Sequence, residues 1–254
     1  MNRIYGILIA AVATIGCATT QSTSAPAGDE PQGVRMRPLA DGVWLFVSNH
    51  EVEGFGDVPA NGLVVAGADG VLLIDKPWTP EKTRTLLGRV ERTLALPVTD
   101  VIFTHAHVDR TGGVTALPQT ARLHALAATA ELSTREGRPF SPTELTGDDA
   151  LMVGEVQVEI LYPGVGHAPD NVVVWLPGRR ILFGGCFIKS ADSAGLGNVA
   201  DADLNGWGVG IQLVEERYRD AAIVVPGHGD VGGPELLSHT RRLVEEALYL
   251  PPLP

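Results

Sequence analysis

The chain has 254 residues, of which 44% are hydrophobic and 19% are charged, so it can bury the core of one globular domain or of two small ones. Its formal net charge is −11. Because so acidic a chain repels phosphate backbones, no nucleic acid partner is expected.

Residues 1–17 have the pattern of an export signal. Arg3 precedes an apolar run over residues 4–15, which is too short to span a bilayer comfortably. The small residue before Cys17 is typical of a bacterial lipoprotein cleavage site, whereas ordinary signal cleavage after Ala18 fits equally well. We therefore expect a periplasmic protein and leave open whether a lipid on Cys17 anchors it to a membrane.

Residues 18–34 are dominated by Thr, Ser, Pro and Gly and predict a flexible tether. The folded domain is expected to follow over residues 35–254. Cys186 is the only cysteine in that domain, so an internal disulfide is not expected there.

Within the domain, short apolar runs alternate with helical patterns. Thr79 has the chemistry of a helix N-cap and Pro80 that of a first helical residue, which predicts a helix to about residue 94. Strands are predicted at residues 43–47, 62–65, 71–74, 98–103, 156–161, 172–176, 181–183 and 222–225, and further helices at 111–117, 125–134, 204–218 and 234–248. This mixture indicates an α/β protein whose buried sheets are covered by helices.

The most informative segment follows the predicted strand at residues 98–103. His105, His107 and Asp109 alternate along it, so they can project toward one side where the backbone is extended. Side chains at the carboxyl ends of strands are the usual active-site groups of α/β sheets. Imidazole and carboxylate ligands suit zinc, so the segment predicts a metal site.

Three further candidate ligands follow or separate strands downstream. His167 lies in a Gly-rich turn, Cys186 follows two glycines, and His228 lies in a Pro-Gly-His-Gly turn. Each alone would be interpreted as an ordinary side chain, as we interpret His50 in an expected loop and His124 in a strand-like run. Together the six candidates divide into two sets of three, which leaves each of two zinc ions the open position that catalysis requires.

These segments resemble the metallo-β-lactamase superfamily and, within it, the β-lactamases of subclass B1. The resemblance covers about residues 43–240. It rests on a metal motif at 105–113, a third-histidine segment at 163–175, an IMP-like cysteine segment at 183–189, a VIM-like continuation at 197–204 and a last ligand motif at 226–229.

Two residues favour the β-lactamase branch over its relatives. Glyoxalase II enzymes, nucleases and most lactonases have a histidine ligand where this chain has Arg110, whose guanidinium keeps its charge and cannot bind zinc. Those relatives also bridge their metals with an aspartate where this chain has Cys186. In addition, the presence of His105 rather than asparagine argues against the mono-zinc subclass.

The resemblance implies an αββα four-layer sandwich, in which two mixed β-sheets are flanked by helices. It also implies two Zn²⁺ ions per chain. The first would be held by His105, His107 and His167, and the second by Asp109, Cys186 and His228.

Further roles are implied by the same resemblance. Asp109 would also orient the attacking hydroxide, Asn198 would lie near the lactam carbonyl, and Lys189 would pair with the substrate carboxylate. Residues 51–59, which include Phe55 between two glycines, resemble a mobile flap over the substrate. Asp75 resembles a carboxylate that supports the ligands.

The implied activity is hydrolysis of the β-lactam amide bond of penicillins, cephalosporins and carbapenems by a zinc-bound hydroxide. We expect a monomeric enzyme that acts on small molecules. The alternative enzyme is a dizinc hydrolase of another small ester or lactone on the same fold. A zinc-binding lipoprotein without turnover is an alternative from a different class.

Overall fold

The computed structural model describes residues 33–249. The expected signal segment at 1–17 and nearly all of the expected tether at 18–34 lie outside the described residues. The first strand begins at Val34. None of the helices between residues 33 and 249 combines the length and the apolar character needed to cross a bilayer.

The strands form two mixed sheets. The seven-stranded sheet has the order β1-β2-β3-β4-β5-β6-β7, and the five-stranded sheet has the order β12-β11-β10-β9-β8. The strands are β1 (Val34–Ala40), β2 (Val43–Val52), β3 (Gly56–Ala66), β4 (Val71–Ile74), β5 (Val98–Ile102), β6 (Arg122–Leu126), β7 (Thr143–Leu145), β8 (Asp148–Val153), β9 (Val156–Leu161), β10 (Val173–Leu176), β11 (Ile181–Gly185) and β12 (Ile223–Pro226). Neighbours are antiparallel from β1 to β4 and parallel from β4 to β7, and in the second sheet only β11 and β12 are parallel.

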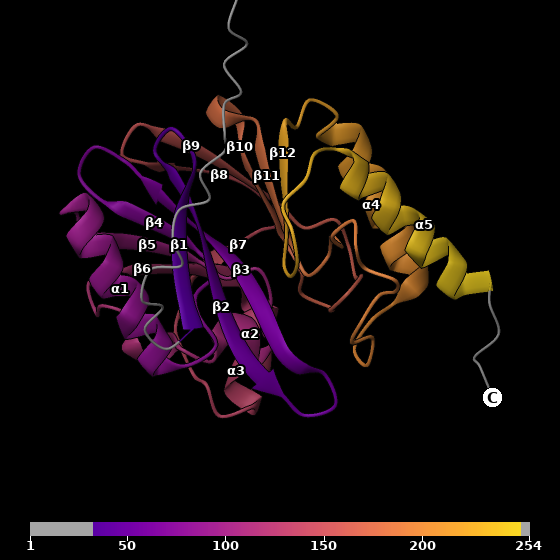
Figure 1. The fold of residues 1–254 in the computed structure, drawn as a ribbon, viewed down its shortest axis with the longest axis horizontal. Helices are drawn as coiled ribbons and strands as arrows, with labels where there is room; N and C mark the ends of the chain where they lie inside the picture. Colours follow the sequence, from indigo (N-terminus) through magenta and orange to yellow (C-terminus); the bar gives the residue numbers. More distant parts are fainter. Residues whose placement is uncertain (1–32, 250–254) are drawn as a thin grey trace, which may run out of the picture.

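Helices lie outside both sheets (Figure 1). Helix α1 covers the seven-stranded sheet, and α4 and α5 cover the five-stranded sheet. The helices are α1 (Pro80–Leu94), α2 (Val108–Thr111), α3 (Ala127–Arg135), α4 (Leu204–Arg217) and α5 (Glu235–Tyr249), with 3-10 turns at Val114–Ala116 and Pro177–Arg179.

Three buried apolar clusters lie between the four layers of helices and sheets. Between the sheets, Ile102 of the first sheet belongs to the same buried cluster as Phe183 of the second. Leu86 of α1 packs with the outer face of the first sheet, and Trp207 of α4 packs with Leu236 of α5 over the second. The predicted αββα sandwich is confirmed.

Helix α1 forms as the sequence predicts. The Thr79 side chain accepts a hydrogen bond from the Lys82 amide at 3.3 Å, and Pro80 begins the helix. Leu86 and Val90 are buried one helical turn apart, which turns one face of the helix toward the sheet.

Two helix predictions are wrong at their boundaries. The alanine-rich stretch predicted as a helix at 125–134 begins inside β6, because residues 122–126 pair in parallel with β5 and β7 and this pairing outweighs alanine's helix propensity. The helix predicted at 111–117 is a single turn, α2, followed after Gly112 and Gly113 by a 3-10 turn.

Several strands are longer than predicted or were not predicted at all. The hairpin of β2 and β3 extends through residues 51–59, so His50 lies in β2 rather than in a loop. The unpredicted strands β1, β7 and β8 lie at sheet edges. Strand β1 contains Pro38, which is tolerated at an edge because no partner needs its missing N–H.

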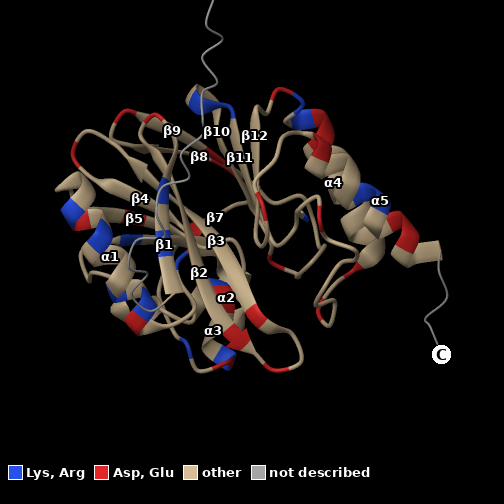
Figure 2. Cartoon of the chain, viewed as in Figure 1, with Lys and Arg blue, Asp and Glu red and all other residues tan. Residues whose placement is uncertain are grey.

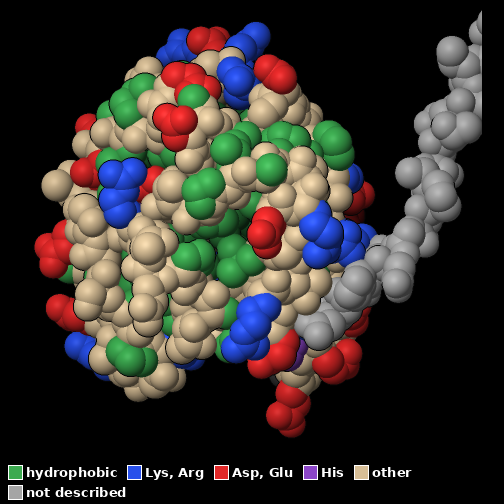
Figure 3. Space-filling model, turned by 90° about the vertical axis from the view of Figure 1, so that its left-hand side faces the viewer, with side chains coloured by type: hydrophobic (Ala, Val, Ile, Leu, Met, Phe, Trp, Pro, Cys, Tyr) green, Lys and Arg blue, Asp and Glu red, His purple; other side chains and the backbone are tan. Residues whose placement is uncertain are grey.

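Charged residues lie mainly on the helices and loops, and the strands β4, β10, β11 and β12 carry none (Figure 2). On the face shown in Figure 3, cations and anions among the described residues are interspersed around hydrophobic side chains. That face therefore presents no continuous basic surface of the kind that binds nucleic acid.

Candidate metal centre

One cleft of about 470 Å³ contains most of the predicted site residues. The β2–β3 hairpin and the loops after β5, β11 and β12 contribute to its walls. The lining residues are Val52, Phe55, Val58, Trp78, His107, Val108, Asp109, Glu136, His167, Cys186, Ile188, Lys189, Ser193, Gly195, Gly197, Asn198, Asp201 and His228.

The loop after β5 carries three of the predicted ligands. Phe103 still donates a backbone hydrogen bond to the β6 residue His124, at 3.0 Å, so the loop leaves the sheet immediately after this point. His107 is the N-cap residue of α2, whose single turn then carries Asp109. Alternation along an extended segment therefore ends at His107, and a helical turn positions the carboxylate.

The rings of His105, His107 and His167 face one another edge to face. Their centroids are 4.7–5.1 Å apart, and each pair of ring planes is close to perpendicular. One nitrogen from each ring lies within 4.8 Å of the others. Three nitrogens arranged in this way can hold one cation.

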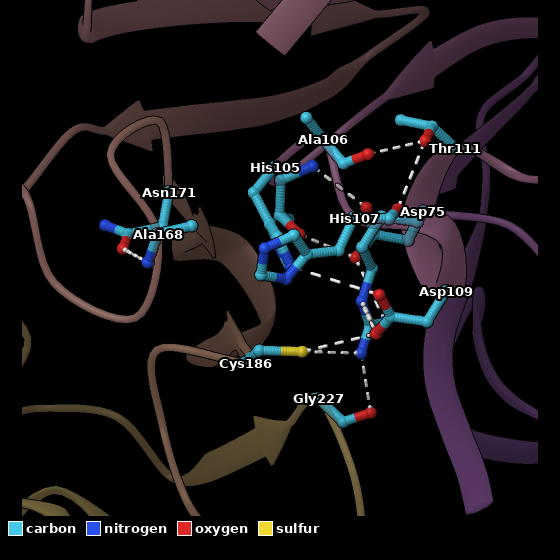
Figure 4. Close-up of polar contacts among 12 residues, drawn as sticks. Asp75, His105, Ala106, His107, Asp109, Thr111, Ala168, Asn171, Cys186 and Gly227 are labelled. Atoms are coloured by element: carbon cyan, nitrogen blue, oxygen red, sulfur yellow. Dashed lines mark hydrogen bonds and ion pairs between the residues drawn. The ribbon is translucent and has the colours of Figure 1, made fainter. Parts of the chain in front are cut away.

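The second predicted set is more tightly clustered. The Cys186 sulfur lies 3.4 Å from Asp109 Oδ2 and 3.2 Å from His228 Nε2, and the last two atoms are 3.2 Å apart. Ligand atoms about 2.0–2.3 Å from a tetrahedral zinc are separated by about 3.4 Å, so these spacings fit a zinc ion. His105 Nε2 lies 4.0 Å from Asp109 Oδ1, so the two sets are adjacent (Figure 4).

The chemistry of the nitrogen donors also fits a metal. His105 Nε2 and His167 Nδ1 are buried and have no hydrogen-bond partner among the described residues. Burial lowers the pKa of both His105 and His167 well below the usual value, so both rings are neutral near neutral pH. Neutral imidazole is the form that binds metal.

The second set carries negative charge. Burial opposes ionisation of Asp109, but the adjacent Arg110 guanidinium holds the pKa of this carboxyl well below its usual range. Burial likewise opposes protonation of His228, but Cys186 and Asp109 raise its pKa to about 9 in the metal-free protein. A cation that binds here would therefore replace a proton.

Arg110 lies directly behind the second set and is fully buried. Its guanidinium forms an ion pair with Asp109 at 2.9 Å, donates to the Cys186 sulfur at 3.0 Å and lies 3.3 Å from Asp75. It also donates to the carbonyl oxygens of Asn61 at 2.6 Å and Gly227 at 2.8 Å. Sequence reasoning excluded Arg110 as a ligand; the structure shows it as the cation that compensates the surrounding anionic groups.

Asp75 is fully buried, as a supporting carboxylate should be. It accepts hydrogen bonds from the Thr104 amide at 2.9 Å and the Thr104 hydroxyl at 2.8 Å. Thr104 directly precedes His105, so Asp75 links β4 to the beginning of the ligand loop. Burial raises the pKa of Asp75 despite the opposing effect of Arg110.

The turn that carries His228 is held by a residue that sequence reasoning missed. Asn61 of β3 donates side-chain hydrogen bonds to the carbonyl oxygens of Pro226 at 2.9 Å and Gly229 at 2.8 Å. The turn packs so closely on Cys186 that a Cβ on Gly227 would lie 2.7 Å from the sulfur. The available sequence signal for Asn61 was an asparagine directly before the apolar strand predicted at residues 62–65.

Asp201 is a second residue that sequence reasoning missed. Its carboxylate lies 3.0 Å from His107 Nε2, so it can accept a hydrogen bond from that ring nitrogen. Metal-binding histidines commonly donate their second N–H to a carboxylate, which fixes the ring orientation. The two residues are 94 positions apart, so no local pattern indicates this pair.

The predicted substrate-binding residues lie on the walls of the same cleft. Lys189 is partly buried, its amide donates to the Thr240 hydroxyl at 2.8 Å, and its ammonium lies 5.3 Å from the centroid of the Trp207 ring. Phe55 is 63% exposed at the tip of the β2–β3 hairpin. Asn198 is exposed, and its side-chain oxygen accepts a hydrogen bond from the Ala200 amide at 3.1 Å. The substrate contacts of these residues stay predictions.

Comparisons with known proteins give matches over most of the chain. A family model described as the metallo-beta-lactamase superfamily matches residues 55–228. A metallo-beta-lactamase type 2 from Bacillus sp. (strain 170) is 43% identical over 218 residues, which cover 85% of this chain and 84% of that protein. One from Bacteroides fragilis is 36% identical over 214 residues, covering 84% of this chain and 86% of that protein.

Solved structures show the same similarity. A metallo-beta-lactamase from Pontibacter korlensis has a TM-score of 0.80 at 38% identity, and the match covers 84% of this chain and 99% of that one. The metallo-beta-lactamase FIM-1 from Pseudomonas aeruginosa, solved in a mono-zinc form, also has a TM-score of 0.80, at 35% identity, covering 87% of this chain and 100% of that one.

Proposed function

Since the chain belongs to the metallo-beta-lactamase superfamily, we propose that it is a β-lactamase that hydrolyses the ring amide of β-lactams with two zinc ions as cofactors. The observation that carries this proposal is the pair of adjacent three-residue sets, five of whose six residues line one cleft together with Lys189. Penicillins, cephalosporins and carbapenems are the proposed substrates.

In this proposal, His105, His107 and His167 hold the first zinc, and Asp109, Cys186 and His228 hold the second. Bound zinc lowers the pKa of a coordinated water to about 7 and polarises a carbonyl group. The residues of the chain then determine orientation. Asp109 belongs to the second set but also approaches the first: its carboxylate lies 4.0 Å from His105 Nε2 and 3.2 Å from His228 Nε2, so it can also accept a proton from a water molecule held there.

Lys189 and Asn198 are the residues that contact the substrate in this proposal. The Lys189 ammonium attracts the carboxylate on the fused ring of the drug, and the Asn198 amide donates to the lactam carbonyl oxygen. Asn198 is exposed on a loop. Its contribution to transition-state stabilisation should therefore be smaller than the roughly 2.7–4 kcal/mol that one rigid oxyanion-hole donor contributes. Phe55 on the hairpin covers the apolar part of the substrate.

Replacing Lys189 with alanine is expected to raise KM about tenfold or more, with a smaller change in kcat. A hydrogen bond to a charged group contributes about 1.5–3 kcal/mol, and this one forms in the bound substrate as well as in the transition state. Steady-state kinetics with benzylpenicillin would measure the change, with Lys189→Arg as the control that keeps the charge. An unchanged KM in Lys189→Ala would rule out the assigned role.

A substrate panel tests the proposed function itself. Purified protein loaded with zinc should open nitrocefin, benzylpenicillin and a carbapenem at rates far above those for a simple ester or an unstrained lactone. Turnover of the esters or lactones alone would instead favour a dizinc hydrolase of another substrate class. Stoichiometric zinc without any turnover would favour a metal-binding protein.

We also propose export to the periplasm, followed by action as a monomer on small molecules. Arg3, the apolar run at residues 4–15 and the residues around Cys17 support this proposal. Mass spectrometry of the mature N-terminus separates the two processing alternatives, because only the lipoprotein route leaves a modified Cys17 as the first residue.

A further inference from the structure

The loop that carries His105, His107 and Asp109 is attached from outside the cleft by one arginine. Arg138 Nε donates to the Thr111 hydroxyl at 2.8 Å, and Arg138 Nη2 donates to the Ala106 carbonyl oxygen at 3.1 Å. Ala106 is the residue between the two histidines. The Arg138 guanidinium therefore holds the loop at the peptide group between His105 and His107, whose orientation affects the direction of both imidazole rings.

Thr111 completes this attachment. Its hydroxyl donates toward the carbonyl oxygens of Ala106 at 2.7 Å and His107 at 3.1 Å (Figure 4). The same hydroxyl accepts the hydrogen bond from Arg138. Thr111 is fully buried, and the Arg138 side chain is 18% exposed. These hydrogen bonds therefore lie largely out of water, where a lost partner leaves a costly unpaired group.

The backbone of Arg138 is itself fixed. Its amide donates to the Ser133 carbonyl oxygen at 2.9 Å, and the buried Ser133 hydroxyl donates to the Arg138 carbonyl oxygen at 2.7 Å. Its guanidinium also pairs with Glu136, which lines the cleft. Arg138 thus connects the carboxyl end of α3 and the cleft wall to the ligand loop.

We propose that Arg138 is a positioning residue that orients His105 and His107 toward His167 and so sets the metal affinity of the first set. This inference rests on the proposed metal centre but not on which substrate is hydrolysed. Asp109 of the second set has its own attachment, the 2.9 Å ion pair with Arg110, so the second set depends less on Arg138.

Metal titration of purified full-length protein tests the proposal. Metal-free wild type, Arg138→Ala, Arg138→Lys and Thr111→Val would be titrated with zinc against a chromophoric chelator. Cobalt(II) titration, read by sulfur-to-cobalt charge transfer from Cys186, would report the second set separately. The matched control is Arg135→Ala on α3, because Arg135 is exposed and contacts only Glu131 among the ion pairs of the described residues.

Loss of a supporting hydrogen bond to a metal site typically weakens metal binding about 10–100-fold. We therefore expect Arg138→Ala to weaken zinc binding at the first set by at least about tenfold, and Arg138→Lys to restore only part of the loss. Thr111→Val should show the same selective loss, which keeps the test valid if Arg138→Ala does not fold. Hydrogen exchange at residues 104–111 should also become faster in the metal-free variants.

Unchanged first-set affinity in Arg138→Ala and Thr111→Val would overturn the proposal, as would an equal loss at both sets. A lower melting temperature with intact zinc affinity would show a purely structural role and would also overturn it. Failure of the wild type to bind zinc would instead refute the proposed function, so the two failures are distinguishable.

Discussion

Chelation of the purified protein is expected to abolish β-lactam hydrolysis, and added zinc is expected to restore it. The candidate ligands lie close together at the cleft, and two of their buried imidazole nitrogens have no hydrogen-bond partner within residues 33–249. The proposed reaction depends on a water activated at this centre, so no residual route should remain. Hydrolysis of nitrocefin before chelation, after chelation and after zinc addition would measure the effect.

A serine nucleophile would give the opposite result, because it would survive chelation. Ser193 contributes the only hydroxyl side chain among the residues that line the cleft in the described part of the chain. Its oxygen lies 3.0 Å from the Ser190 hydroxyl. Ser193→Ala is therefore the matched control and should retain activity. Chelator-resistant turnover that Ser193→Ala abolishes would refute the metal mechanism.

Metal removal should also lower stability, which gives a readout independent of turnover. A ligand at a hundred times its Kd stabilises the native state by about 2.7 kcal/mol, which corresponds to a rise of about 5–10 °C in Tm for a domain of this size. Thermal unfolding with and without zinc would test this expectation. An identical Tm in both conditions would show that the centre binds no zinc.

Replacing Arg110 with methionine is expected to destabilise the metal-free protein by about 3–5 kcal/mol, because removal of one partner leaves buried charge uncompensated. The guanidinium is fully buried and contacts Asp109, Cys186 and Asp75. Urea unfolding would measure the loss as a lower midpoint at an unchanged slope.

The control and a second variant make this prediction specific to charge compensation. Arg84→Met removes an exposed arginine whose ion pair with Glu81, at 3.5 Å, is also exposed, and it should leave the unfolding midpoint almost unchanged. Bound zinc should reduce the loss in Arg110→Met, because the cation compensates Asp109 and Cys186. Neutralising Asp75 as well, in Arg110→Met/Asp75→Asn, should recover part of the stability, because asparagine can still accept from Thr104 and tolerates the positive φ of 59° at this position. Unaltered stability in Arg110→Met would contradict the structural role assigned to this residue.

The identity of the candidate ligands could be predicted from local sequence. His105, His107 and Asp109 follow a run of buried strand residues, and His228 lies in a turn rich in glycine. Such patterns depend on neighbours within a few positions, which a single sequence displays directly. The same applies to α1, whose N-cap Thr79 and apolar spacing are local features.

Strand pairing could not be predicted in the same way. Residues 125 and 126 begin the alanine-rich stretch that the sequence predicts as a helix, yet they belong to β6, where they pair with β7. The edge strand β1 contains Pro38, which weakens every local strand signal. In both cases the strand is stabilised by pairing with residues that are distant along the chain. This stabilisation outweighs the local conformational propensity of the strand's own residues.

The sequence by itself thus determined which side chains could bind metal, because ligand chemistry belongs to the residue type and strand ends are local features. Only the tertiary structure decided what holds those side chains in place. Arg110 reaches Asn61 across 49 positions and Gly227 across 117, and Asp201 reaches His107 across 94. Contacts over such separations form only in the folded domain, where strands that are distant in the sequence lie side by side, so no periodicity along the chain encodes them.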